Sequence, residues 1–127
     1  MRKPGIIKID KIVLECKDPV ELSDFYIKLL GWEKGYDNND FIIIGSETGN
    51  IDIGFQKNTD FIAPKWPDVE GEQQMMLHLD FCVAASEHQE WVEYAIYCGA
   101  KKADFQYSKD WTVMIDPEGH PFCIDPS

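Results

Sequence analysis

The chain has 127 residues, of which 44% are hydrophobic, and a formal net charge of −11. This length supports one domain with a hydrophobic core, and the apolar content is typical of a globular chain rather than a disordered one. The negative charge argues against nucleic-acid and membrane partners, because anionic phosphates are bound by clustered lysine and arginine. Since the sequence has neither a signal peptide nor an apolar run near the roughly 18 residues of a membrane helix, we expect a cytoplasmic protein.

The first half of the chain has the pattern of a βαβββ unit. Residues 6–16 alternate between apolar and polar side chains, which predicts a half-buried strand. Asp18 and Pro19 are typical of a helix N-cap and first helical position, and Gly31 is typical of a helix end. Three further strands are predicted at residues 32–36, 41–45 and 50–56.

The second half repeats this order after a linker. Residues 58–73 are rich in proline and charge, which indicates the linker. A strand is then predicted over residues 75–83. It is followed by a predicted helix that begins with a capping box at Ser86 and ends at Gly99, and by three more predicted strands. These last strands are predicted at residues 100–105, 111–115 and 121–125. The chain is therefore expected to be one domain over residues 1–127, with modules at about 6–57 and 74–125.

A site is expected in the groove between the two modules, where equivalent strands face each other. Lys11 and His78 occupy equivalent positions, so the internal repeat predicts that they lie on facing sides of one cavity. A buried lysine needs a partner, which we expect to be Glu15, Asp80 or a bound anion. The other predicted lining residues are Gln56, Trp66, Trp111 and Cys123.

Several motifs that lie in order along the chain carry a resemblance to a known family. They are Phe25-Tyr26, Leu29-Leu30-Gly31-Trp32, Phe55-Gln56, Trp66-Pro67, His78-Leu79-Asp80, Gly99-Ala100, Asp116-Pro117-Glu118-Gly119 and Phe122-Cys123. The set resembles the glyoxalase-like branch of the vicinal oxygen chelate superfamily, which includes glyoxalase I, extradiol dioxygenases and bleomycin-resistance proteins. The resemblance implies an α+β fold in which two βαβββ modules form a curved mixed sheet around a cup.

The resemblance also implies where a metal would bind. Metal-dependent relatives hold one divalent ion with four side chains from the two modules. The matching positions here are Lys11, His78, Cys123 and either Ile53 or, after a shift of one residue, Asp52. Only His78 is an ordinary ligand, and a lysine would repel the ion, while a soft cysteine does not suit a hard, oxygen-rich site. We therefore predict no metal and no other cofactor.

The favoured function is the binding of a small organic molecule in the cup. The predicted ligand-binding residues are Lys11, Glu15, Gln56, His78, Asp80, Trp111 and Cys123. One alternative is a lyase or isomerase in which His78, the candidate catalytic residue, transfers a proton together with a nearby carboxylate. The other alternative is a metal-dependent enzyme of the glyoxalase or dioxygenase type. The exposed edge of the predicted sheet further indicates a homodimer.

The other histidines and the cysteines have structural interpretations. His88 on a helix surface and His120 in a turn are expected to be solvated. No two of the cysteines form a C-x-x-C pair, so free thiols are expected. A nucleophilic pair of Cys123 and His78 is disfavoured, because the sequence offers no identifiable oxyanion hole.

Overall fold

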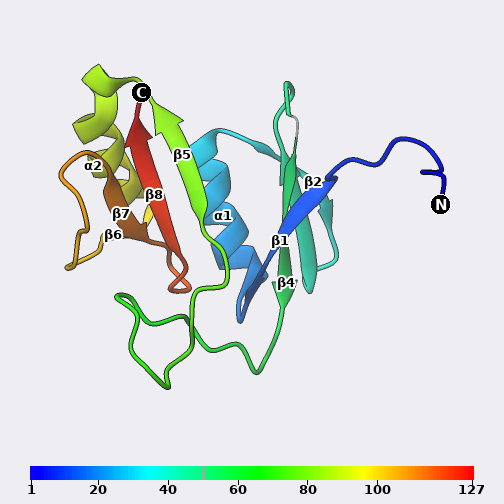
Figure 1. Ribbon diagram of the computed structural model, residues 1–127, viewed down its shortest axis with the longest axis horizontal. Helices are drawn as coiled ribbons and strands as arrows, with labels where there is room; N and C mark the ends of the chain where they lie inside the picture. The colour runs from blue at the N-terminus through cyan, green and yellow to red at the C-terminus, as the bar shows by residue number, and fades with distance from the viewer. Residues whose placement is uncertain (50) are drawn as a thin grey trace.

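The computed structural model describes residues 1–49 and 51–127, and within them the chain forms two βαβββ modules, each with a four-stranded sheet (Figure 1). The strand order is β1-β4-β3-β2 in the first sheet and β5-β8-β7-β6 in the second. In both sheets the first and last strands of the module pair in parallel, and the remaining neighbours are antiparallel. The expected α+β fold of two such modules is therefore confirmed, with the hydrogen bonding divided between two sheets.

Each module runs strand, helix and three strands. Module one contains β1 (Lys11–Cys16), α1 (Pro19–Leu30), β2 (Glu33–Asp37), β3 (Phe41–Gly45) and β4 (Asp52–Lys57). Module two contains β5 (Leu79–Val83), the 3₁₀ turn η1 (Ala85–Glu87), α2 (His88–Cys98), β6 (Lys101–Lys102), β7 (Thr112–Ile115) and β8 (Pro121–Pro126). Neither helix in the described part of the chain is long and apolar enough to cross a membrane.

The first strands of both modules are shorter than the alternation of side chains predicts. β1 begins at residue 11 rather than 6, and β5 begins at residue 79 rather than 75. A strand requires hydrogen bonds to a neighbour, and alternation along one segment does not reveal whether a neighbour is present. The expected strand over residues 50–56 is found from Asp52 onward, while residue 50 lies outside the described residues.

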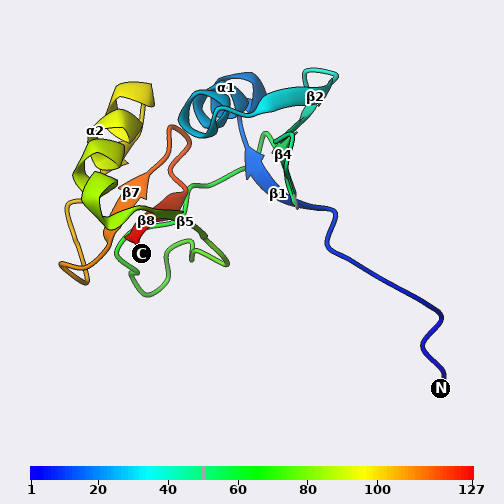
Figure 2. The ribbon, with the colours of Figure 1, turned by 90° about the horizontal axis from the view of Figure 1, so that it is seen from above.

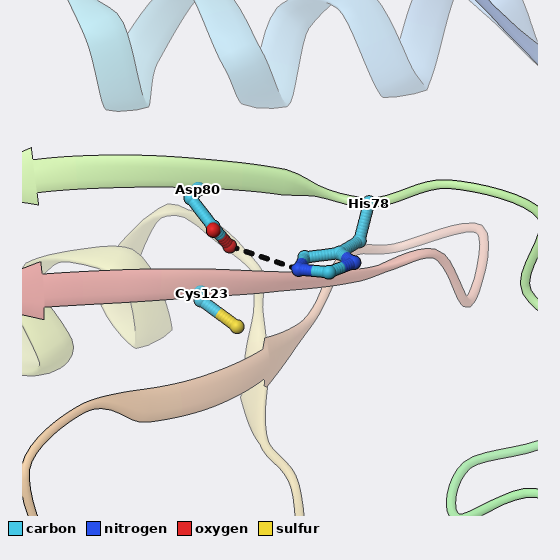
Figure 3. A group of neighbouring side chains, drawn as sticks. All are labelled: His78, Asp80 and Cys123. Carbon is cyan, nitrogen blue, oxygen red and sulfur yellow. Dashed lines mark ion pairs between the residues drawn. The ribbon is translucent and has the colours of Figure 1, made fainter.

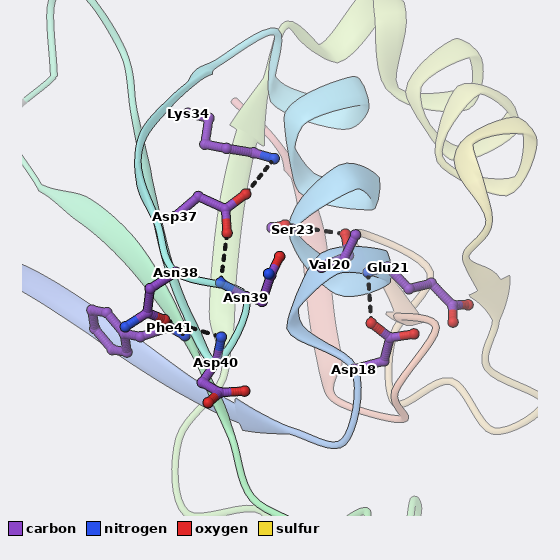
Figure 4. A network of polar contacts seen from close by, with 10 residues as sticks. All are labelled: Asp18, Val20, Glu21, Ser23, Lys34, Asp37, Asn38, Asn39, Asp40 and Phe41. Atoms are coloured by element: carbon purple, nitrogen blue, oxygen red, sulfur yellow. Dashed lines mark hydrogen bonds and ion pairs between the residues drawn. The ribbon is translucent and has the colours of Figure 1, made fainter.

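Local polar contacts fix the start of α1 and the turn between β2 and β3, as Figure 4 shows. The Asp18 side chain accepts a hydrogen bond from the backbone N–H of Glu21 at 3.1 Å, as expected for an N-cap. The helix ends at Gly31, whose φ of 69° lies in the left-handed region that glycine tolerates. In the turn, the Asn38 side chain accepts a hydrogen bond from the Phe41 N–H at 2.7 Å.

The start of α2 differs from the prediction. Ser86 was expected to cap the helix, but residues 85–87 form a 3₁₀ turn and Glu87 is the N-cap, without a side-chain hydrogen bond. Within this turn the Glu87 N–H donates to the Ala84 carbonyl at 2.9 Å. A preceding 3₁₀ turn meets part of the need for hydrogen-bond partners at a helix start, so the serine cap is not required. Gly99 ends the helix as predicted, with a φ of 128°.

One hydrophobic core joins the two modules through α1. The Tyr26 ring of α1 stacks on Phe55 of module one, with 5.6 Å between the ring centroids. The same ring lies 6.1 Å from Phe122 and 6.4 Å from Phe81, both in module two. Its hydroxyl donates to the buried Asp116 carboxylate at 2.8 Å. Figure 2 shows both helices on the same side of the molecule, so the opposite, outer faces of the two sheets carry no helix.

The turn between β7 and β8 adds polar contacts between the modules. The two carboxylate oxygens of Glu118 accept hydrogen bonds from the backbone N–H groups of Lys17, at 2.8 Å, and Asp18, at 3.1 Å. Module two thus holds the connection between β1 and α1 in place.

The two histidines that were expected to be solvated both have hydrogen-bond partners. His88 Nε2 lies 3.1 Å from Thr112 Oγ1, and His120 Nε2 lies 2.7 Å from the Glu15 carbonyl oxygen. The prediction of solvated rings is therefore wrong for both. A helix surface or a turn is open to solvent by itself, but here a neighbouring strand approaches each ring.

Candidate functional site

The outer face of the module two sheet contains a cavity of about 510 Å³. Its polar lining includes His78, Asp80 and Asp125, and its aromatic lining consists of Trp66, Tyr107 and Trp111. Cys123 lies at its base in β8. The cavity therefore brings together four of the residues that the sequence analysis proposed for binding, namely His78, Asp80, Trp111 and Cys123.

The parallel pairing of β5 and β8 places the polar residues of the cavity. Asp80 lies directly opposite Cys123 in the register of these strands. Because side chains alternate along a strand, the neighbours Leu79 and Phe81 point the other way, where both pack against the core. Asp125 follows Cys123 by two residues in β8 and therefore shares its face.

The His78, Asp80 and Cys123 side chains form a compact cluster, shown in Figure 3. His78 Nε2 lies 3.0 Å from Asp80 Oδ1, and one ligand atom from each of the three residues lies within 4.8 Å of the others. A carboxylate at this distance orients an imidazole ring through a hydrogen bond. The pair can therefore hold a polar group or transfer a proton at the cavity.

The electrostatic surroundings keep the cysteine of this cluster neutral. Burial raises the pKa of the Cys123 thiol to about 12, and the negative charges of Asp80 and Asp125 act in the same direction. Burial also raises the pKa of Asp125, an effect that Asp80 strengthens and that His78 opposes. A thiol must lose its proton to be a good nucleophile, so this environment does not support Cys123 as a nucleophile paired with His78.

The same cluster is the candidate site for the divalent ion that the fold implies. It offers one imidazole nitrogen, one carboxylate and one thiol, all from module two. A hard ion such as Mn²⁺ prefers oxygen donors, and a thiol with a pKa of about 12 would first have to lose its proton. The cluster does not fit such an ion; among divalent ions, zinc is the one whose donor preferences these three residues match best.

The aromatic wall comes partly from the segment that connects the modules. The Trp66 indole N–H donates to the Phe105 carbonyl at 3.0 Å, and the Trp66 ring meets Tyr107 edge to face, with 5.4 Å between the centroids. Trp111 precedes β7 and remains 40% exposed. Rigid aromatic surfaces of this kind, combined with a few polar groups, are typical of small-molecule sites.

Three proposed binding residues lie elsewhere. Lys11 pairs with its neighbour Asp10 rather than with Glu15 or Asp80. Glu15 borders a separate groove beside His120, and the Gln56 side chain on β4 is exposed. His78 lines the cavity of module two and Lys11 does not, so the two residues do not share this cavity as predicted. An internal repeat reveals equivalent positions but not the angle between the modules.

The register of the strands also corrects the expected fourth ligand position in module one. Val13 pairs with Gly54 in module one, as Asp80 pairs with Cys123 in module two. With Lys11 matched to His78, the counterpart of Cys123 is therefore Gly54. Ile53 points into the core and is 4% exposed, so it cannot line a cup, and Asp52 is two residues away from the matching position.

Other lining residues were not predicted from the sequence. Asp125 could have been found, because it stands two residues after Cys123 on the same strand. Asp68, Met75 and Tyr107 belong to irregular segments beside the cavity. No periodicity places such residues, so only the folded chain shows that they line it.

The fold and the position of this cavity define the class of protein. Paired βαβββ modules with a cavity on the outer sheet face are the architecture of the vicinal oxygen chelate superfamily. The model of the glyoxalase-like domain family matches residues 11–124, and the chain belongs to this family. No curated protein is significantly similar to the chain.

Solved structures with the same fold have low sequence identity to the chain. A glyoxalase/bleomycin resistance protein/dioxygenase family enzyme from Burkholderia phytofirmans is 20% identical, with a TM-score of 0.70 over 92% of this chain and 96% of that one. The fosfomycin resistance protein FosX from Listeria monocytogenes, in complex with Mn(II) and sulfate, is 14% identical, with a TM-score of 0.69 over 97% and 92%. FosX from Mesorhizobium loti is 10% identical, with a TM-score of 0.67 over 97% and 94%. These similarities establish a shared fold but not a shared activity.

Proposed function

We propose that the chain binds a small organic molecule in the cavity of module two, without a metal ion. The observation that carries this proposal is the combination of a cavity of about 510 Å³ with an aromatic wall and the His78–Asp80 pair. The volume lies in the range of pockets that accommodate drug-sized ligands. Aromatic side chains supply contact area at a low cost in conformational entropy, while the polar pair orients the ligand.

A library screen by thermal shift tests this proposal. A ligand that binds the folded state raises Tm in proportion to the logarithm of its concentration over Kd. The shift should be lost in Trp111→Ala and reduced in His78→Ala. Tyr36→Ala is the matched control, because Tyr36 is a similarly exposed aromatic residue on module one, 50% exposed against 40% for Trp111. A ligand whose shift is unchanged in Trp111→Ala would contradict the proposed site.

A second candidate function is proton transfer by a lyase or isomerase. The 3.0 Å separation of His78 Nε2 and Asp80 Oδ1 supports it, because a carboxylate that orients an imidazole makes it an effective general base. Turnover of carbonyl substrates should then fall at least about 100-fold in His78→Ala. Assays with and without added divalent metal distinguish this function from a metal-dependent glyoxalase or dioxygenase type of enzyme. If no carbonyl substrate is turned over under either condition, binding remains the favoured function.

We also propose that the protein is a homodimer. β1 and β5 are edge strands of their sheets, and the N-terminal segment exposes Ile6, Ile7 and Ile9 to solvent. Exposed strand edges and apolar segments are commonly covered by a second copy. Sedimentation should give about twice the monomer mass of 14.6 kDa at tens of micromolar, and Ile7→Lys with Ile9→Lys should shift the protein toward the monomer. A monomeric wild-type protein would contradict the proposal.

The cytoplasm is the proposed location of this single domain. The four cysteines are free and Cys82 is exposed, which suits a reducing compartment. Cell fractionation tests the location.

A further inference from the structure

We propose that the cavity of module two selects organic cations, namely aromatic molecules that carry an amine or a quaternary ammonium group. This inference rests on the proposed function, since it names the ligand class of the same site. It follows from two independent features of the cavity, the signs of its charges and the type of its walls.

The charged groups that line the cavity are predominantly acidic. Asp68, Asp80 and Asp125 contribute carboxylates, and His78, the one basic side chain among the described residues of the lining, lies beside Asp80. Even with His78 protonated, the carboxylates outnumber the cations. An anionic ligand would therefore be repelled, whereas a cation would gain electrostatic attraction inside a partly enclosed space.

The three carboxylates come from different parts of the chain. Asp68 belongs to the connecting segment, Asp80 to β5 and Asp125 to β8. Asp80 and Asp125 lie on the paired strands β5 and β8 and line the same cavity, so a cation bound there would be attracted by both carboxylates.

The walls suit the apolar part of the same ligand. Trp66 and Tyr107 meet edge to face, and Trp111 contributes a further indole ring to the lining. Aromatic faces attract cations through their quadrupoles, and tryptophan does so most strongly. Indole and phenol rings next to carboxylates are the combination that recognises alkylammonium groups, because the rings contact the methyl or methylene surface while the carboxylates balance the charge.

Three probes of similar shape test the charge preference: 2-phenylethylamine, 2-phenylethanol and 3-phenylpropionate. Binding is measured by titration at low ionic strength, with Trp fluorescence or calorimetry as the readout. We expect the amine to bind at least about tenfold more tightly than the alcohol, and the carboxylate to bind more weakly than both. Addition of salt to 0.5 M should weaken binding of the amine but not of the alcohol, because screening acts only on charge.

Variants locate the preference in the cavity. Asp125→Asn and Asp68→Asn together should reduce the ratio of amine to alcohol affinity to about threefold or less. Asp24→Asn is the control, since it changes the net charge through an exposed position on α1. Trp111→Ala should weaken both the amine and the alcohol. A preference that is lost equally in Asp24→Asn would reflect net charge alone and would overturn the proposal.

The outcomes separate this inference from the proposed function. Equal affinity for amine and alcohol would overturn the cation preference but leave small-molecule binding intact. Tighter binding of 3-phenylpropionate would also overturn it and would indicate that a cationic side chain, such as one from a second copy of the chain, lines the cavity. If none of the probes binds, the cation preference is wrong, and the library screen then decides the proposed function by itself.

Discussion

The two modules share a framework but differ on their outer faces. Both pair their first and last strands in parallel, and both end their helix at a glycine with positive φ. On the outer face, however, Val13 and Gly54 of module one stand where Asp80 and Cys123 stand in module two. The repeat therefore preserves the strand pairing and the helix end, while the polar side chains of the candidate site lie in module two.

Packing around Gly54 explains why module one has no comparable cavity at this position. A Cβ atom added there would lie 3.1 Å from the Phe41 ring and 3.3 Å from Val13. These two side chains cover the glycine and fill the space that opens beside Cys123 in module two. The connecting segment adds a second difference, since it brings Trp66 onto module two. Within the described residues, the cluster of His78, Asp80 and Cys123 therefore has no counterpart at the matching positions of module one.

The strongest effect on stability should come from the core that joins the modules. Phe122 is fully buried and its ring contacts Phe25, Tyr26 and Phe81. We expect Phe122→Ala to lower the free energy of unfolding by about 3–5 kcal/mol, because it removes apolar contacts and leaves a void. Phe41→Ala, on the partly exposed outer face of module one, should cost clearly less. Urea denaturation of both variants measures the difference, and equal losses would show that the outer face of module one is covered in solution.

A smaller loss is expected at the polar contact between the modules. Glu118→Ala removes the acceptor of the Lys17 and Asp18 N–H groups and should lower the free energy of unfolding by about 1–3 kcal/mol. Glu118→Gln keeps one oxygen and should lose less. If the alanine and glutamine variants both match the wild type in urea denaturation, this turn does not couple the modules.

The buried Asp116 should make stability depend on pH. Burial raises the pKa of this carboxylate, against the opposing effects of His120 and the Tyr26 hydroxyl. The folded state then retains its proton at a pH where the unfolded state has lost it, so stability falls as pH rises from the ordinary pKa of an aspartate toward the raised value. For one proton, the free energy of unfolding cannot change by more than about 1.4 kcal/mol per pH unit.

Asp116→Asn tests this pH effect, because asparagine keeps the shape but does not titrate. The free energy of unfolding of the wild type minus that of the variant should decrease as pH rises through the acidic range, and it should level off above the raised pKa. A difference that is independent of pH between about 3 and 7 would contradict a raised pKa at Asp116.

The smallest effect is expected from removal of metal. Protein purified without a chelator should contain well under one equivalent of zinc, nickel, manganese or iron by elemental analysis. EDTA should then change Tm by no more than about 1 °C, because a ligand that is absent contributes no stability. Zinc is the most informative of the four metals, since the cluster of His78, Asp80 and Cys123 matches its donors best. Stoichiometric zinc that is lost in Cys123→Ser together with thermal stability would overturn the prediction.

The order and type of the elements could be predicted from the sequence because they depend on local rules. Asp18 and Gly31 act as caps through their own side chain and backbone conformation, and both do so in the structure. The prediction of a polar face on β5 was correct for the same reason, since alternation is a property of the strand itself. Ser86 failed as a cap because a 3₁₀ turn, which has no strong sequence signal, supplies the contacts instead.

The site was predicted only in part, because it depends on both local pattern and tertiary geometry. His78 and Asp80 share a face through strand alternation, which the sequence shows, and the parallel pairing of β5 with β8 brings Cys123 beside them in the structure. The modules are joined instead by the packing of Tyr26 and by the contacts of Glu118, which link residues far apart in the chain. Lys11 is not among the residues that line the cavity with His78. The sequence by itself thus determined the two modules and the polar strand face. The tertiary structure decided which face forms a cavity and which residues of the irregular segments close it, since those contacts join residues far apart in the chain.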